Sequence, residues 1–390
     1  MMALDASTVS GAAVQYVLTY PNSTYPGAGL VQNATGDMVV QIGRFAGPFE
    51  GAETVLGGAG SVTVSGYYGK TQVVLPAPYD GSTYSEDKLL YQQDVLPASD
   101  LLVGGSAGNN LIIARSFGTT IFGGGNGDVL EGWGDPQGGD TIIAGPGAET
   151  VFGNGSGFNQ PLDNGNLTTG RENFSLPPDG NLLVGGSGPD LIVGGPGRDT
   201  IVAGTGADTI ATGVGGSLVQ LGAGGDVVNL SGADTVLGSP GNATISATGS
   251  ALMFAGPGAT NFLNGAAAST LVGGGGGTTL YAGAGGGVFV GGAGGGNLLV
   301  GGSGLSLMYG GAGAGNVFQF NSGTGGADVI GDFDPSRDRV ALAGFAPGTA
   351  DAVLATATVA NGSVSIVLPD ATQVTFYHLA ALTGADFGAG

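Results

Sequence analysis

The clearest pattern along the chain is a short apolar run that returns every nine residues between glycine-rich turns. Three such units follow one another without a gap in residues 185–211, and they read GGSGPDLIV, GGPGRDTIV and AGTGADTIA. Each apolar run fits one short strand. Its middle side chain points to one face of the strand, and the side chains on either side of it point to the other face. The pattern predicts short stacked strands with Ile192, Ile201 and Ile210 pointing inward.

Polar positions recur in the same register. Each unit has glycine at its second and fourth positions and aspartate at its sixth. These residues are Gly186, Gly188, Asp190, Gly195, Gly197, Asp199, Gly204, Gly206 and Asp208. Glycine permits φ > 0 in a tight turn and exposes backbone carbonyls, and aspartate supplies a hard oxygen ligand. The combination favours calcium sites; the alternative is a solenoid whose Gly-Asp turns bind no ion.

This pattern resembles the glycine-rich nonapeptide of the RTX (repeats-in-toxin) family, G-G-x-G-x-D-x-U-x. The resemblance implies an all-β fold, a parallel β-roll or β-solenoid that binds Ca²⁺, with two nonapeptides of opposite direction in each coil. Ligands would then stack every eighteen residues. Asp190, Asp208 and Asp226 would line one edge and Asp199 the other, with Gly224 in the turn before Asp226.

The repeat continues on both sides in weaker form. Residues 101–153 are predicted as degenerate repeats with Asp128 and Asp140 as candidate metal ligands, although their separation breaks the nine-residue register. Residues 154–180 contain three prolines and are predicted as a loop insertion. Residues 181–237 hold the calcium-binding repeats.

Residues 238–320 keep the period but lose the aspartate. The ligand position falls on Thr278, Gly287, Ser306 and Gly315. A thin core is predicted from Phe254, Phe262, Leu280, Phe289, Met308 and Phe318. Neutral hydroxyls and glycine are poor calcium ligands, so the pattern predicts a calcium-free second half. Its apolar, nearly uncharged coils suit packing on another copy; an inert spacer is the alternative.

The two ends differ from the repeats. Residues 1–100 are predicted as an N-terminal β-rich cap or small domain. Residues 321–390 resemble the C-terminal cap and secretion region of RTX proteins exported by type I systems. The matching residues are Asp328, Ile330, Asp332, Phe333, Asp338, Asp386 and Phe387.

The amino-acid composition limits the classes of binding partner that suit this chain. The 390 residues include 85 Gly and no Cys, and 29 acidic against 8 basic residues give a net charge of −21. Nucleic acid is an unsuitable partner because phosphate binding needs clustered Lys and Arg. Divalent cations are the natural counter-ions. No apolar run is long enough to span a membrane, and the N-terminus lacks the basic cluster of a Sec-type signal peptide.

Enzyme motifs are weak. The single histidine is His378, and the G-x-S-x-G run at residues 104–108 lies in a repeat turn. Carboxylates for glycoside chemistry are confined to Asp135, Asp140 and Glu172, and a carbohydrate-active enzyme is therefore the third hypothesis. The sequence predicts a secreted, non-enzymatic, calcium-dependent structural protein that self-associates in a surface layer or filament. The rival hypothesis is an adhesin that binds polysaccharide through residues 154–180 or the N-terminal segment.

Overall fold

The computed structural model describes residues 101–114, 118–132, 139–153, 180–258, 260–275, 277–313 and 315–388, together with the backbone of six strands between residues 3 and 66. The chain divides into two compact units, Met1–Ile201 and Val202–Gly390. Each unit is a β-solenoid, in which successive short strands alternate between two parallel sheets, sheet A and sheet B. The prediction of an all-β solenoid is confirmed.

In unit 1, sheet A consists of β2 (Ala13–Thr19), β4 (Asp37–Ile42), β6 (Val62–Gly66), β8 (Leu111–Ile113), β10 (Val129–Glu131), β12 (Thr150–Phe152) and β14 (Leu191–Val193). Sheet B consists of β3 (Gly29–Gln32), β5 (Glu53–Leu56), β7 (Leu101–Val103), β9 (Thr120–Phe122), β11 (Thr141–Ile143) and β13 (Leu182–Val184). Among the described strands of unit 1, β1 (Ala3–Thr8) alone runs antiparallel, against β2. The strands before residue 67 therefore pair in register with the repeats.

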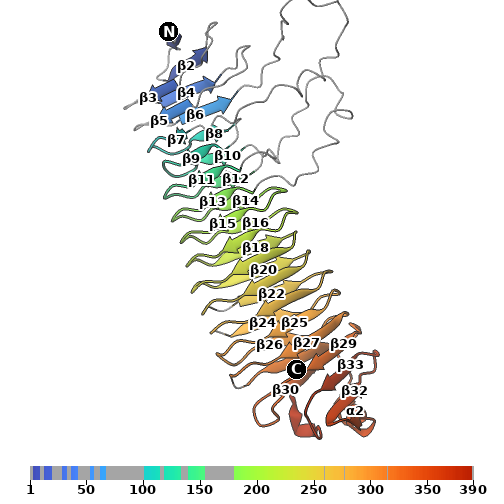
Figure 1. Cartoon of the computed structure of the whole chain (residues 1–390). Coiled ribbons are helices and arrows are strands. Elements are labelled where there is room, and N and C mark those ends of the chain that lie inside the picture. The colour runs from blue at the N-terminus through green and yellow to red at the C-terminus, as the bar shows by residue number, and fades with distance from the viewer. Residues whose placement is uncertain are drawn as a thin grey trace, which may run out of the picture. The chain divides into compact units, whose positions relative to one another are not determined.

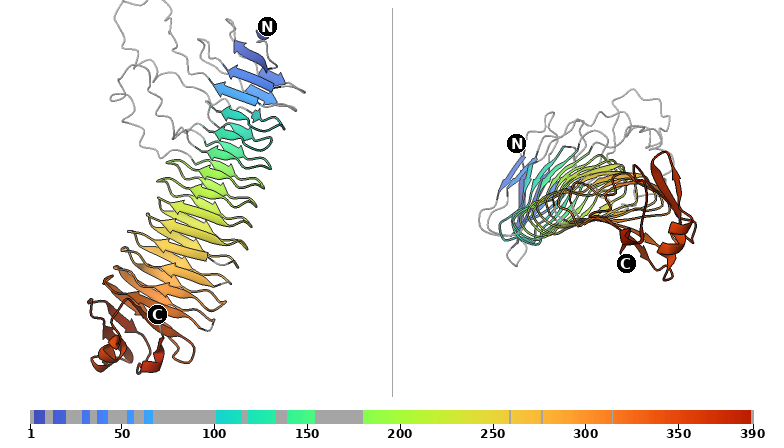
Figure 2. Two further views of the ribbon diagram at one scale, coloured as in Figure 1. Left: turned by 180° about the vertical axis from the view of Figure 1, so that it is seen from behind. Right: turned by 90° about the horizontal axis from the view of Figure 1, so that it is seen from below.

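In unit 2, sheet A consists of β16 (Thr209–Ala211), β18 (Asp226–Leu230), β20 (Ala243–Ala247), β22 (Thr260–Asn264), β24 (Thr278–Tyr281), β26 (Leu298–Val300), β28 (Val317–Asn321), β30 (Arg339–Ala343) and β34 (Phe387–Gly388). Sheet B consists of β17 (Leu218–Gln220), β19 (Asp234–Leu237), β21 (Ala251–Phe254), β23 (Ser269–Val272), β25 (Gly287–Val290), β27 (Leu305–Tyr309), β29 (Ala327–Ile330) and β33 (Gln373–Phe376). Figures 1 and 2 show these coils stacked one upon the next. Strand β15 (Thr200–Val202) lies at the boundary between the units.

The core of each unit is a narrow column of side chains between the two sheets. Most strands of the first repeats are three residues long and bury only their middle side chain, as β14, β15 and β16 bury Ile192, Ile201 and Ile210. In unit 2 the column includes Phe262, Leu280, Phe289, Met308 and Phe318. These predicted inward positions are confirmed.

Phe254 is an exception, because the structure places it outside with 43% of its surface exposed. Strand β21 buries Ala251 and Met253, so the period-two alternation sends Leu252 and Phe254 outward. The prediction that Phe254 fills the core is wrong by one position.

The solenoid of unit 2 ends in a cap built from residues 331–388. Strands β32 (Ser363–Val367) and β31 (Thr358–Ala360) add antiparallel to β33, and the short helix α2 (Thr349–Ala355) lies beside them at the C-terminal end (Figure 1). The turn η1 (Gly384–Asp386) precedes β34. Phe333 packs edge-on against Phe376 at 5.2 Å between ring centroids. Within the described residues, the structure holds no helix with the length and hydropathy of a membrane span.

Candidate calcium sites

Three buried carboxylates stand in a column along one inner edge of unit 1. Asp128, Glu149 and Asp190 immediately precede β10, β12 and β14, which pair in parallel register. The backbone N–H of Glu149 donates to Asp190 Oδ1 at 2.9 Å. The stacked strands thus bring the carboxyl groups of successive coils next to one another.

Asp190, Asp199 and Asp226 share one bonding pattern. One carboxylate oxygen accepts the N–H of the glycine four residues earlier, and the other accepts the N–H of the matching residue in the preceding coil. Asp199 does both, with Gly195 at 2.7 Å and Asn181 at 2.8 Å. Asp226 does the same with Gly222 at 3.2 Å and Asp208 at 3.1 Å. Each aspartate therefore joins its own turn to the previous coil.

Two aspartates that lie outside the strict nine-residue spacing still enter this pattern. Asp140 precedes β11 and its Oδ1 accepts the N–H of Thr119 at 2.8 Å. Asp234 opens β19 and its Oδ1 accepts the N–H of Ser217 at 2.7 Å. The spacing slips in the sequence, but each side chain still reaches the inner edge because the turns differ in length.

The site glycines are needed for close approach between turns. A Cβ on Gly186 or Gly188 would overlap the carbonyl oxygen of Gly145 or Gly147 in the previous coil, and Gly224 is equally close to Gly206. Of these three site glycines none has positive φ, whereas Gly204 has φ 101°. The expected left-handed turn thus accounts for Gly204, and tight stacking accounts for the other three.

The column in unit 1 is electrostatically strained. Burial raises the pKa of Glu149 to about 7, against the hydrogen bond from the Gly145 N–H, and the charges of Asp128 and Asp190 raise it further. Burial also raises the pKa of Asp190. Glu149 Oε1 is buried and accepts no hydrogen bond. Like charges this close disfavour full ionisation unless a cation lies among them.

These donors fit calcium. Ca²⁺ prefers six to eight oxygen ligands and accepts carboxylates and backbone carbonyls together. Among the described residues no three acidic or histidine side chains converge on a single point, so carboxylates alone do not complete a site. Asp128, Glu149 and Asp190 would each contribute a carboxylate in successive coils, with backbone carbonyls of the glycine turns completing the coordination, and bound calcium would supply positive charge to the column.

Two of the coils after Asp234 use asparagine at the same place, Asn297 and Asn316. Asn297 Oδ1 accepts the N–H of Thr278 at 3.2 Å, as an aspartate would. Its Nδ2 donates to the carbonyls of Gly292 and Gly310 at 3.0 and 3.1 Å, and to Asn316 Oδ1 at 2.9 Å. The amide therefore satisfies turn carbonyls with its own N–H groups, which is the role a cation would otherwise have.

The asparagines shift the predicted register in this half. Asn316 is buried at the position predicted for Gly315, which is itself exposed. One coil here has nineteen residues, as the Asn297–Asn316 contact shows. Two units of nine residues give eighteen, so a strict nine-residue count places the ligand position one residue too early. Thr278 and Ser306 are buried at their predicted positions.

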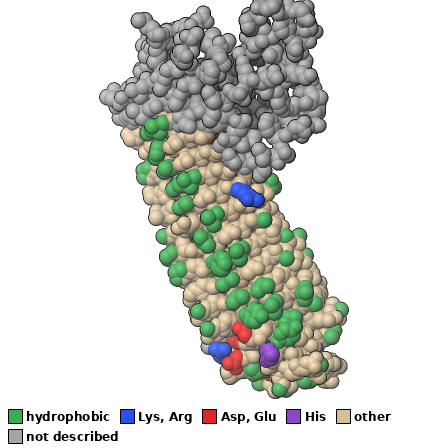
Figure 3. Space-filling view, viewed as in Figure 1, with side chains coloured by type: hydrophobic (Ala, Val, Ile, Leu, Met, Phe, Trp, Pro, Cys, Tyr) green, Lys and Arg blue, Asp and Glu red, His purple; other side chains and the backbone are tan. Residues whose placement is uncertain are grey.

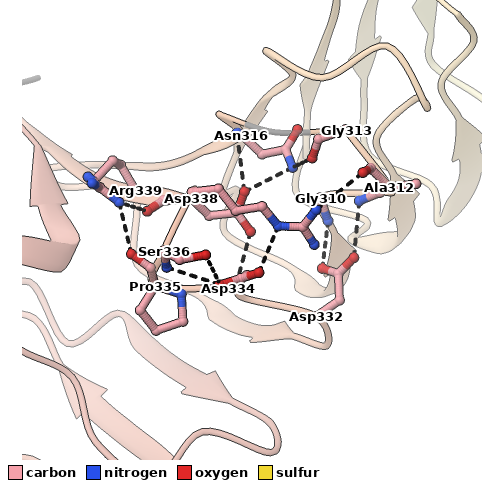
Figure 4. Close-up of polar contacts among 12 residues, drawn as sticks. Gly310, Ala312, Gly313, Asn316, Asp332, Asp334, Pro335, Ser336, Asp338 and Arg339 are labelled. Carbon is pink, nitrogen blue, oxygen red and sulfur yellow. Dashed lines mark hydrogen bonds and ion pairs between the residues drawn. The ribbon is translucent and has the colours of Figure 1, made fainter.

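The C-terminal cap is tied to the last coils by acidic side chains (Figure 4). Asp332 accepts the N–H groups of Gly310 and Gly311 at 2.7 and 3.0 Å. Asp338 Oδ1 accepts both N–H groups of Asn316, backbone and side chain, at 3.2 and 3.0 Å. These carboxylates are already occupied by backbone and amide donors, which gives them a structural role in joining cap to solenoid.

Fold and site together define a parallel β-solenoid with glycine turns and inward carboxylates. The family profile for RTX calcium-binding nonapeptide repeats matches four copies in this chain, over residues 49–70 and 179–210. Together with the stacked parallel coils, this match fits an RTX β-roll protein, and the matched repeats indicate Ca²⁺ binding. No curated protein matches significantly.

Among solved structures, the extracellular lipase LipA from Serratia marcescens is similar at 18% sequence identity with a TM-score of 0.22. The match covers 54% of this chain and 39% of the lipase chain. The chain therefore spans well under half of that protein's length. At this level the likeness carries no argument about activity.

The sequence interpretation missed part of the repeat. The family match at residues 49–70 coincides with β5 and β6. Its sequence from Gly57 keeps glycine at the first, second and fourth positions of the unit but has Val62 at the sixth, the ligand position. It also passed over Asn181 and Asn297, because an amide does not match the aspartate consensus. Two of the carboxylates considered for glycoside chemistry, Asp135 and Glu172, lie outside the described residues, as does most of the predicted insertion at 154–180.

Proposed function

We propose that this protein is a secreted structural protein that folds on extracellular calcium and associates with copies of itself in a surface layer or filament. RTX repeats are typical of proteins exported by type I systems, which is consistent with an extracellular location. The proposal assigns the chain no catalytic step. It is supported by the calcium-binding repeats in one part of the chain and by the absence of charged side chains over residues 235–327 in another.

The observation that carries the proposal is the column of Asp128, Glu149 and Asp190. Where calcium is scarce, three buried carboxylates within one stack oppose closure of the coils. Where calcium reaches about 10⁻⁴–10⁻³ M, weak extracellular sites fill, and the binding free energy becomes folding free energy. The chain would then stay extended during export and fold outside.

Circular dichroism of the purified chain in chelator and in about 1 mM calcium tests the first half of the proposal. We expect the β-sheet signal to increase and the thermal midpoint to rise with calcium. A spectrum and midpoint that calcium leaves unchanged would contradict calcium-dependent folding.

Light scattering and electron microscopy of the calcium-loaded protein test the second half. Large, ordered particles that disappear in chelator are expected. A protein that stays monomeric with calcium and binds surface polysaccharide would instead support the adhesin hypothesis.

A further inference from the structure

The two outer faces of unit 2 differ in chemistry. On sheet A, the outward residues of β16 to β24 include Thr209, Asn229, Thr244, Ser246 and Thr279. On sheet B, most of the outward side chains of β19 to β29 are apolar. One face of this solenoid is therefore mixed and polar, and the other is largely apolar.

The apolar face has an in-register column at its centre. Consecutive strand pairings align Leu237, Phe254, Val272, Val290 and Tyr309. Each of these side chains is exposed or half-exposed. The column extends beyond Tyr309, whose ring covers Gly331 so closely that a Cβ there would overlap it.

A second column runs beside the first. Leu252, Val288, Leu307 and Val329 occupy the outward position two residues earlier on their strands, with Thr235 and Thr270 between them in the same register. Together the two columns form the sheet B strip, the outward side chains of β19, β21, β23, β25, β27 and β29. Sheets that pack face to face lie about 10 Å apart, so the outward side chains of such a strip can interdigitate with those of another sheet.

Charge does not oppose such packing. Residues 235–327 contain no Asp, Glu, Lys, Arg or His, and the inward carboxylates Asp234 and Asp328 are buried. On the face of unit 2 seen in Figure 3, hydrophobic side chains are spread over the coils and the acidic ones in view gather near the C-terminal end. Two copies can therefore bring this strip together although each chain carries a net charge of −21.

We propose that the sheet B strip is the surface through which two copies of this chain associate face to face. This rests on the proposed self-association and specifies the surface that carries it. Six strands spaced about 4.8 Å apart, each about four residues long, give a strip of roughly 29 by 13 Å, or about 380 Å² per copy. That is about half of the roughly 800 Å² per partner in a stable complex. The contact is consequently weak, reversible and dependent on concentration.

Paired lysine substitutions on the two faces test the proposal. Leu237→Lys with Phe254→Lys alters the strip, at side chains that are 39% and 43% exposed. Val227→Lys with Tyr281→Lys is the matched control on the outer face of sheet A, at side chains that are 44% and 39% exposed. Both variants add the same charge and reduce the net negative charge equally, so overall repulsion does not distinguish them.

Sedimentation velocity in calcium across roughly 1–100 µM measures self-association of the full chain. We expect the strip variant to weaken association at least about tenfold and the control to stay within about twofold of wild type. Equal effects in both variants, or none in either, overturn the proposal that the strip is the contact surface, while the proposed self-association still stands. A wild-type chain that is monomeric at every concentration overturns the proposed function and this inference together.

Folding is checked separately by far-ultraviolet circular dichroism of each variant. If the lysine pair on the strip prevents folding, Leu237→Thr with Phe254→Thr keeps strand propensity and removes the apolar surface. The same loss of association is expected from this milder pair. Wild-type association by a folded threonine pair overturns the proposal.

Discussion

At the scale of single residues, Asp328 is the one carboxyl group among the described residues with both oxygens buried and without a hydrogen bond. It lies inward on β29, opposite Ser306 of β27, and is 2% exposed. Neither carboxylate oxygen makes a hydrogen bond; the nearby Ser306 hydroxyl lowers the pKa only in part, and burial raises it to about 7. The neutral acid is therefore the form that this core accommodates.

The raised pKa predicts that the last coils lose stability as pH rises. The ordinary pKa is 3.8 and the folded value is about 7, so the group contributes fully below about pH 4, and this contribution is lost progressively up to about pH 7. A shift of this size corresponds to roughly 4 kcal/mol. Hydrogen exchange of β27–β29 should be slower at pH 5 than at pH 8 after correction for intrinsic rates.

Asp328→Asn should remove that pH dependence and slow exchange at pH 8. Asp351→Asn, at an exposed position on α2, is the control and should leave the exchange profile as in wild type. A wild-type pH profile in Asp328→Asn would mean that another group governs the end of the solenoid.

Asparagine and aspartate at the same inner position differ in hydrogen bonding, because the amide nitrogen donates to carbonyl groups and an ionised carboxylate only accepts. Asn297 donates to two glycine carbonyls, whereas an aspartate there would leave those carbonyls unpaired and add a buried charge. We expect Asn297→Asp to destabilise the chelated protein by about 1–3 kcal/mol and to make its thermal midpoint more sensitive to calcium. Thermal unfolding with and without calcium measures both effects.

The outer-face substitution Asn229→Asp provides the comparison, since Asn229 is exposed on β18. It makes the same chemical change without touching a turn carbonyl. A calcium response of similar size in both variants would refute the idea that the amide substitutes for the ion.

At the scale of the elements, close stacking of the turns limits which glycines can be replaced by a residue with a side chain. Gly224 lies where a Cβ would overlap the Gly206 carbonyl, but the adjacent Gly225 has nothing within 4 Å. Backbone cannot yield as a flexible side chain does, so the same Gly→Ala change should have different consequences one residue apart.

Gly224→Ala should therefore destabilise unit 2 by roughly 1–3 kcal/mol, the usual cost of overpacking. Gly225→Ala should be neutral or stabilise by up to about 1 kcal/mol, because it reduces the entropy of the unfolded chain. Thermal midpoints in saturating calcium compare the two. If both variants melt alike, the turns are looser than the structure indicates.

At the scale of the whole molecule, one fold combines two ways of satisfying its turns. Carboxylates and calcium serve the repeats around residues 185–235, and amides serve the coils around residues 290–320. This division predicts which substitutions alter calcium uptake.

Changing Asp190, Asp208 and Asp226 together to Asn should lower the number of bound calcium ions and reduce the thermal gain from calcium. Changing Thr278 and Ser306 to Ala should leave calcium uptake unaltered. Isothermal titration calorimetry counts the ions in each case. Equal losses in the two sets would show that the calcium sites are not where the carboxylates stand.

The sequence alone determined the period, the parallel solenoid and the calcium chemistry, because each nine-residue unit carries its strand, turn and ligand locally. It placed Ile192, Ile201 and Ile210 inside for the same reason. Only the tertiary structure decided the register where the coil length changes, as at Asn316 and Phe254. A one-residue slip reverses which side of a strand faces inward, and only the neighbouring coil fixes that choice.

Tertiary structure also decided which polar groups meet. Glu149 reaches Asp190 across forty-one residues, and the apolar strip exists only because five strands align Leu237 with Tyr309. Such contacts depend on stacking between coils, which a local pattern does not encode, since the same nine residues can pair with any coil of matching length.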